Sequence, residues 1–214
     1  MTSQLQPQPT TDEKTFSIYE LDDAARERAL ADHYDWNIGY DDWYEFVYED
    51  AKRIGEILGF DLRKIYFSGF WSQGDGACFV GRTMFPDKHP FEVMAELVSH
   101  APHDEDLHSI AQDWIAAQGA VSYSAVGQIT HTDRYCHEHS VAFEWERDFD
   151  KAGPDDDGYF DSETDGTLTA PVRAFMRWIY RQLEAEYDHF TSDESIAEAL
   201  EANEVRFTEE GERA

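Results

Sequence analysis

The sequence predicts an α+β fold in which a small antiparallel sheet, built from two hairpins, is covered by several helices. The first observation is a pair of apolar runs, Ile65–Trp71 and Ala77–Val80, which flank a short polar stretch containing Asp75-Gly76. Asp-Gly between two such runs is typical of a hairpin, because glycine reaches the positive φ of a primed turn without steric cost. Large rings on both faces of the first run place this hairpin at the buried centre of the sheet. The second observation is a pair of alternating segments, 121–132 and 136–147, which predicts another hairpin.

The third observation is helical spacing of apolar residues in the rest of the chain. A first helix is expected after Asp22, and a second is expected to be capped by Asp41 and Asp42 and to end at Gly59. Further helices are expected over 91–98, over 104–118, from Pro171 in a first turn to about 187, and from 192 to 203. Side chains expected to face the core include Phe46 in the second helix and, in the third, Phe91, Met94, Ala95 and Val98.

The length of 214 residues suits one sizeable domain. We expect residues 15–207 to form a single α+β domain that carries a solvated acidic loop at 148–166. Residues 1–14 are polar, without the apolar core of a signal peptide, and are expected to be a disordered tail; residues 208–214 are expected to be a charged tail.

Charge is the outstanding feature of the composition. The chain has 46 Asp and Glu against 17 Lys and Arg, a formal net charge of −29, while 41% hydrophobic residues provide for a packed core. Such a field repels nucleic acids and anionic membranes and attracts cationic surfaces, so a basic protein partner is expected. Two cysteines and no apolar run long enough to span a membrane favour a cytoplasmic protein.

Three segments, YEFVYEDAKRIGEILG, KIYFSGFWSQGDGACF and FMRWIYRQLEAEYDHFTSDE, resemble a family of phage- and prophage-borne proteins. Its members are commonly labelled "antitoxin of toxin–antitoxin stability system". The resemblance covers about residues 16–210. It implies a mobile-element protein that acts in a bacterial cytoplasm by binding another macromolecule, and it implies no catalytic residues.

Acidic side chains are therefore the candidate binding residues. Carboxylates at i, i+3 and i+4 on a helix lie about 5–6 Å apart, a spacing comparable to that of phosphates along a duplex strand. They would present a phosphate-like field to a basic cleft, as in an inhibitor of a host-defence enzyme or in an antitoxin. An acidic surface serving solubility or salt adaptation is the alternative. The candidate partner-binding residues are Asp148, Asp150, Asp155, Asp156, Asp157, Asp161, Glu194, Glu198 and Glu201.

A different class of function would use Cys78. The run Gly74–Phe79 also resembles the Asp-Gly-x-Cys-Phe signature of ovarian-tumour-type cysteine proteases, and a hydrolase would pair Cys78 with His131, His137 or His139. The residues after Cys78 read as strand and not as the helix that activates such a thiol, so we expect a structural cysteine. His137 and His139, two apart on an expected strand, lack the usual zinc-ligand spacing, and we expect neither metal nor cofactor.

Overall fold

The computed structural model describes residues 14–40, 42–132, 134–148 and 158–214, and these residues form six helices and one antiparallel sheet. They group into a smaller unit, made of the described parts of 1–43 and 187–214, and a larger unit, 44–186. A single domain over 15–207 stays a prediction. Within the described ranges, no helix has an apolar stretch long enough to cross a membrane.

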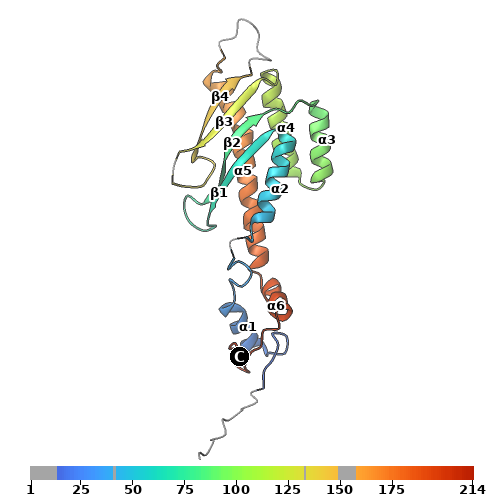
Figure 1. Ribbon diagram of the computed structural model, residues 1–214, viewed down its shortest axis with the longest axis vertical. Coiled ribbons are helices and arrows are strands. Elements are labelled where there is room, and N and C mark those ends of the chain that lie inside the picture. Colours follow the sequence, from blue (N-terminus) through green and yellow to red (C-terminus); the bar gives the residue numbers. More distant parts are fainter. Residues whose placement is uncertain (1–13, 41, 133, 149–157) are drawn as a thin grey trace, which may run out of the picture. The chain divides into compact units, whose positions relative to one another are not determined.

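The larger unit contains the sheet. Its strands are β1 (Phe60–Ser68), β2 (Gly76–Met84), β3 (Ala125–His131) and β4 (Val141–Arg147), and they are hydrogen-bonded in the order β1-β2-β3-β4 (Figure 1). Every neighbouring pair is antiparallel. The α+β prediction, with a sheet made of two hairpins, is confirmed.

The first hairpin turns differently from the prediction. β1 ends at Ser68 and Gly76 already belongs to β2, so Asp75-Gly76 is not the turn. The positive φ values fall at Gly69 (37°) and Gly74 (96°), and the Asp75 carboxylate accepts hydrogen bonds from two backbone N–H groups of the loop, at 3.0 and 2.6 Å. The expected two-residue turn is wrong because this side chain organises a longer loop. β1 is also an edge strand, so of this hairpin only β2 lies inside the sheet.

The second hairpin has a longer connection than expected. β3 ends at His131, β4 starts at Val141, and the Thr132 N–H donates to the Ser140 carbonyl at 2.9 Å. His137 and His139 therefore lie in the connection, and their placement on a strand was wrong.

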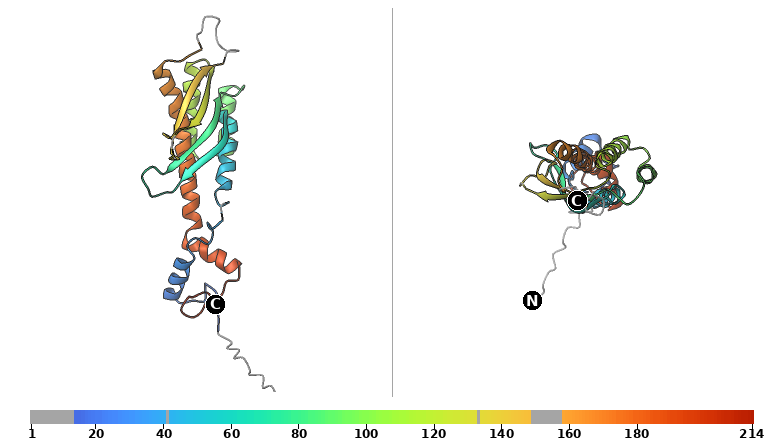
Figure 2. Two further views of the ribbon diagram at one scale, coloured as in Figure 1. Left: turned by 60° about the vertical axis from the view of Figure 1, so that its left-hand side comes forward. Right: turned by 90° about the horizontal axis from the view of Figure 1, so that it is seen from above.

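Helices cover one face of the sheet in the larger unit. α2 (Glu45–Leu58), α4 (Glu105–Ala120) and α5 (Ser162–Phe190) lie along this face, and α3 (Pro90–His100) packs on α2 and α4 (Figures 1 and 2). The Phe60 ring is at the centre of the core, with ring centroids 5.0 Å from Trp114, 5.4 Å from Phe175 and 6.3 Å from Phe79. One continuous apolar core thus joins both hairpins to α2, α3, α4 and α5.

Two helix starts differ from the prediction. The residue before α2 is Tyr44, which makes no side-chain capping bond, so the expected capping of this helix by Asp42 is wrong; Asp41 lies outside the described residues. α5 begins at Ser162, so Pro171 is inside the helix and the predicted acidic loop does not extend through 162–166. The helix continues through Pro171 because buried packing holds it: Thr169 accepts the Trp145 indole N–H at 2.9 Å.

The predicted core face of α3 is also wrong. This helix buries Val93 and Leu97, while Phe91 is 74% exposed and Val98 is 41% exposed. In α2, Phe46 is 73% exposed, although the same helix buries Ile54 and Leu58 as expected from their spacing. Helical spacing identified apolar positions on α3 but not the side that meets the core.

The smaller unit is formed by α1 (Asp23–Asp32) and α6 (Asp193–Ala202), which pack through a core of their own. The expected charged tail at 208–214 folds back: the Arg28 guanidinium donates to the Glu210 carbonyl at 2.7 Å, and the Thr208 N–H donates to the Glu212 carbonyl at 2.8 Å. The buried residues of this core are Ile18, Ala29, Leu30, Ile196, Ala197, Leu200, Val205 and Phe207.

Candidate partner-binding surface

A row of carboxylates runs along the exposed side of α6. Ser192 caps this helix by accepting a hydrogen bond from the Ser195 N–H at 3.3 Å. The apolar side of α6 is buried in the smaller unit, which turns Glu194, Glu198 and Glu201 to solvent. Because these glutamates follow i, i+4, i+7 spacing, they share one helix face. The structure therefore brings together three of the predicted binding residues.

The cations of the smaller unit do not neutralise this row. In its described part, Lys14, Arg26 and Arg213 lie over aromatic rings, at 4.6, 5.3 and 5.4 Å from the ring centroids. Arg28 bonds a backbone carbonyl, and Arg206 lies 3.8 Å from the carboxylate of Glu20. Among the described residues, no salt bridge reaches the three α6 glutamates, so this face keeps its negative charge.

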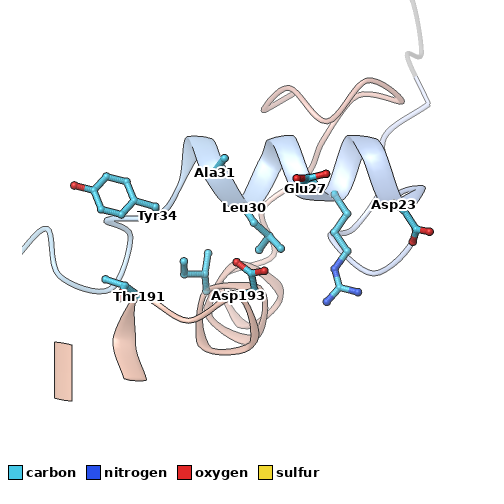
Figure 3. A pocket seen from close by; sticks show the side chains of 9 residues that line it. Asp23, Glu27, Leu30, Ala31, Tyr34, Thr191 and Asp193 are labelled. Atoms are coloured by element: carbon cyan, nitrogen blue, oxygen red, sulfur yellow. The ribbon is translucent and has the colours of Figure 1, made fainter. Parts of the chain in front are cut away.

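A hollow of about 530 Å³ lies between α1 and α6 (Figure 3). Asp23 and Glu27 of α1 and Asp193 of α6 place carboxylates around it, and the buried side chains of Leu30 and Ile196 form part of its wall. Tyr34, which is 55% exposed, lies at one end of the hollow, as Figure 3 shows.

Arg26 of α1 also lines the hollow, so a cationic side chain of this chain already lies among these carboxylates. Its apolar stem and charged head match a wall that combines apolar residues with carboxylates. Asp23 and Asp193 also occupy first turns of helices, where a carboxylate stabilises the positive end of the helix dipole. The hollow therefore combines three carboxylates with one cation of this chain.

The other predicted binding residues have different surroundings. Asp161 is exposed, and its carboxylate accepts the Thr164 N–H at 2.8 Å at the start of α5; this bond holds the pKa of Asp161 below its usual value. Asp148 follows β4, is half-buried, and donates its N–H to the Ser124 carbonyl at 2.7 Å. Both belong to the larger unit, whereas the α6 row belongs to the smaller one. Asp150, Asp155, Asp156 and Asp157 lie outside the described residues.

Cys78 is buried in the core of the larger unit. Burial raises the pKa of its thiol to about 12, and the nearby Cys136 and Glu138 add to the rise. A nucleophilic cysteine needs a lowered pKa and an accessible sulfur. Neither condition is met, in agreement with a structural role for Cys78.

The three histidines considered with Cys78 make other contacts. His131 hydrogen-bonds the Tyr135 carbonyl at 2.8 Å, and its ring stacks on Tyr66. The His137 Nδ1 accepts the N–H of His139 at 3.0 Å. Across the described ranges, no group of three or more His, Cys, Asp or Glu side chains has a geometry that would hold a metal ion.

The hollow is the feature that the sequence did not predict. α1 and α6 stand near opposite ends of the chain, and neither helix carries a motif that pairs it with the other. The carboxylates of the hollow are a few among the 46 Asp and Glu of the chain, so residue type gave no signal for it.

Comparison with curated proteins and with solved structures gives no match. A family profile does match the chain, over residues 43–193. This span contains the whole larger unit and ends at the first residue of α6. Because it covers more than half of the chain, the protein belongs to the family described as "Domain of unknown function (DUF8835)".

Proposed function

We propose that this chain is an acidic, non-enzymatic protein of a phage or prophage that binds and antagonises a basic macromolecular partner in the cytoplasm of its bacterial host. The partner is a nucleic-acid-binding enzyme of host defence, which the chain inhibits by mimicking nucleic acid, or a toxin. The observation that carries the proposal is the row of Glu194, Glu198 and Glu201, exposed on one face of α6 and without a salt bridge among the described residues.

Electrostatics supports this function. Glutamates one turn apart repeat at a spacing comparable to that of phosphates on a duplex strand. A net charge of −29 speeds encounter with a cationic protein and keeps nucleic acid away. The three carboxylates around the hollow between α1 and α6 outnumber its one cation, Arg26, and add to the negative charge of the smaller unit. The resemblance to phage- and prophage-borne antitoxin-labelled proteins supports the same assignment.

The test is affinity capture of the full chain in a bacterial host lysate, with bound proteins identified by mass spectrometry at low and at high salt. We expect a cationic protein that is retained at about 0.05 M NaCl and lost at about 0.5 M, where the Debye length falls to about 4 Å. Duplex DNA added to the complex should release a nucleic-acid-binding enzyme and leave a toxin bound.

A charge-matched pair of variants localises the contact. Changing Glu194, Glu198 and Glu201 together to Gln should abolish capture. Changing Glu49, Glu144 and Glu146 to Gln removes the same charge from exposed positions of the larger unit and should leave capture intact. Equal losses in the two triple variants, or recovery of no cationic protein at low salt, would rule the proposal out.

A further inference from the structure

The hollow between α1 and α6 contains a guanidinium that has no ionic partner among the described residues. Arg26 is half-buried, and its Nε is buried without a hydrogen-bond partner in that part of the chain. The guanidinium carbon lies 5.3 Å from the centroid of the Tyr19 ring, a contact that leaves its positive charge uncompensated. Because a charge taken out of water without a partner is costly, this side chain favours a bound anion.

Two carboxylates of the same hollow are also unpaired. Glu27 of α1 and Asp193 of α6 line it and are exposed, as Figure 3 shows for their two helices. Within the described ranges, neither carboxylate makes a salt bridge, and Arg26 therefore does not reach either of them. The hollow thus holds opposite charges that line one space of about 530 Å³ without meeting.

We propose that this hollow binds a zwitterion, namely an α-amino acid with an apolar side chain. The carboxylate of such a ligand accepts hydrogen bonds from the Arg26 guanidinium, and its ammonium donates to Asp193 or Glu27. Both charges of the ligand stand on one carbon, so a single molecule gives each of these protein groups the partner that it lacks.

The rest of the lining selects the ligand side chain. Ala31 and the Tyr34 ring are exposed in the hollow, and Leu30 and Ile196 form the wall behind them. A side chain the size of leucine fits a space within the usual range of ligand pockets. A simple cation is a poorer ligand because Arg26 repels it, and a simple anion is a poorer ligand because the carboxylates repel it.

The hollow is open to solvent, so water weakens each ionic contact and we expect an affinity of about 1 mM. None of Glu194, Glu198 and Glu201 lines the hollow. The zwitterion site and the proposed partner-binding row can therefore fail independently.

Nuclear magnetic resonance titration of the isotope-labelled full chain tests the site with three probes. L-leucine carries both charges, leucinamide lacks the carboxylate, and 4-methylpentanoate lacks the ammonium. At about 0.05 M NaCl, L-leucine should shift amide signals of α1 and α6, and each truncated probe should bind at least about tenfold more weakly. Leucinamide that binds as tightly as L-leucine would identify a site for cations only, and no binding of L-leucine at about 50 mM would exclude a site. Either result overturns the proposal.

Two variants separate the two charges of the site. Arg26→Gln should weaken L-leucine about tenfold without weakening leucinamide, which has no carboxylate to lose. Glu27→Gln combined with Asp193→Asn should weaken L-leucine similarly without weakening 4-methylpentanoate. Because each variant keeps one probe, a loss of the fold is recognised as a loss of both.

Charge-matched controls lie in the smaller unit, at exposed positions outside the hollow. Arg206→Gln matches the change at Arg26, and Asp32→Asn combined with Glu212→Gln matches the loss of two carboxylates. Both controls should bind L-leucine like the original chain. Variants of the hollow that bind L-leucine as tightly as these controls would overturn the assignment.

Discussion

The Trp114 indole N–H donates a hydrogen bond of 2.8 Å to the carbonyl of Leu58, which lies 56 residues earlier in the chain. Leu58 is the last residue of α2, where a helix leaves carbonyls without a partner of its own, and both residues are buried. The Trp114 side chain of α4 thus provides a hydrogen-bond donor for a carbonyl at the end of α2. It also packs on Phe60, the first residue of β1.

Replacing this tryptophan should destabilise the larger unit. Trp114→Phe leaves the buried Leu58 carbonyl without its donor and removes part of a fully buried ring, so we expect the free energy of unfolding to fall by about 2–4 kcal/mol. Urea titration followed by circular dichroism measures this change. Trp71→Phe, at a position that is 77% exposed, is the control and should stay within about 0.5 kcal/mol of the original chain.

Two glycines should respond to alanine with opposite signs. Gly59 ends α2 at φ 84°, and a Cβ there would lie 1.9 Å from the Met84 carbonyl oxygen, so Gly59→Ala should cost about 2 kcal/mol or more. Gly166 lies within α5 with nothing within 4 Å of the added Cβ, so Gly166→Ala should stabilise by about 0.5–1 kcal/mol. Urea midpoints of the two variants check this, and two shifts of the same sign would contradict it.

Cys78 should be unreactive in the folded protein. Its pKa of about 12 leaves almost no thiolate at pH 8, and its side chain is buried. Alkylation by iodoacetamide, followed by mass spectrometry, should therefore be at least about tenfold slower than in urea. Rapid alkylation at Cys78 in the folded chain would instead support the thiol-hydrolase alternative.

The Cys78 thiol also makes the free energy of unfolding depend on pH in the alkaline range. Since the folded pKa lies above the usual value of 9.0, the unfolded chain loses this proton first, and stability declines as the pH rises from about 9 towards 12. We expect the unfolding free energy to fall less steeply over this range in Cys78→Ala than in the original chain. Parallel pH profiles for the two proteins would show that the thiol is not buried as described.

Asp161 should stabilise α5. Because its pKa lies below the usual value, its contribution is present above about pH 4 and is lost as the pH falls through the folded pKa. Asp161→Ala should lower the melting temperature at pH 7 and have a smaller effect near pH 3. Asp161→Asn keeps a side-chain oxygen for the Thr164 N–H and should restore most of the loss. Equal melting temperatures for Asp161→Ala and the original chain at pH 7 would exclude this role.

Local patterns predicted most of the elements. The two apolar runs of the first hairpin and the two alternating segments of the second contributed to paired strands, and glycine ended α2 at Gly59 in the left-handed conformation. These predictions succeeded because strand alternation and helix caps depend on neighbouring residues. The prediction of the first hairpin's turn was wrong because the Asp75 side chain accepts hydrogen bonds from the backbone of its own loop. Turn propensities of single residues do not predict such a side-chain bond.

The candidate surface was predicted only in part. Glu194, Glu198 and Glu201 fall on one helix face by spacing alone, and the sequence indicated them. The hollow with Asp23, Glu27 and Asp193 needed the packing of α1 on α6, two helices far apart in the chain. No local pattern reports which helix meets which.

The sequence by itself determined the strands and helices and the excess of negative charge, because these follow from residue types and their short-range spacing. Tertiary structure alone decided which side of α3 is buried. α3 has apolar residues on two sides, and packing on α2 and α4 selects Val93 and Leu97 while Phe91 stays in solvent. Burial is a property of the surfaces that meet, and those surfaces come from distant parts of the chain.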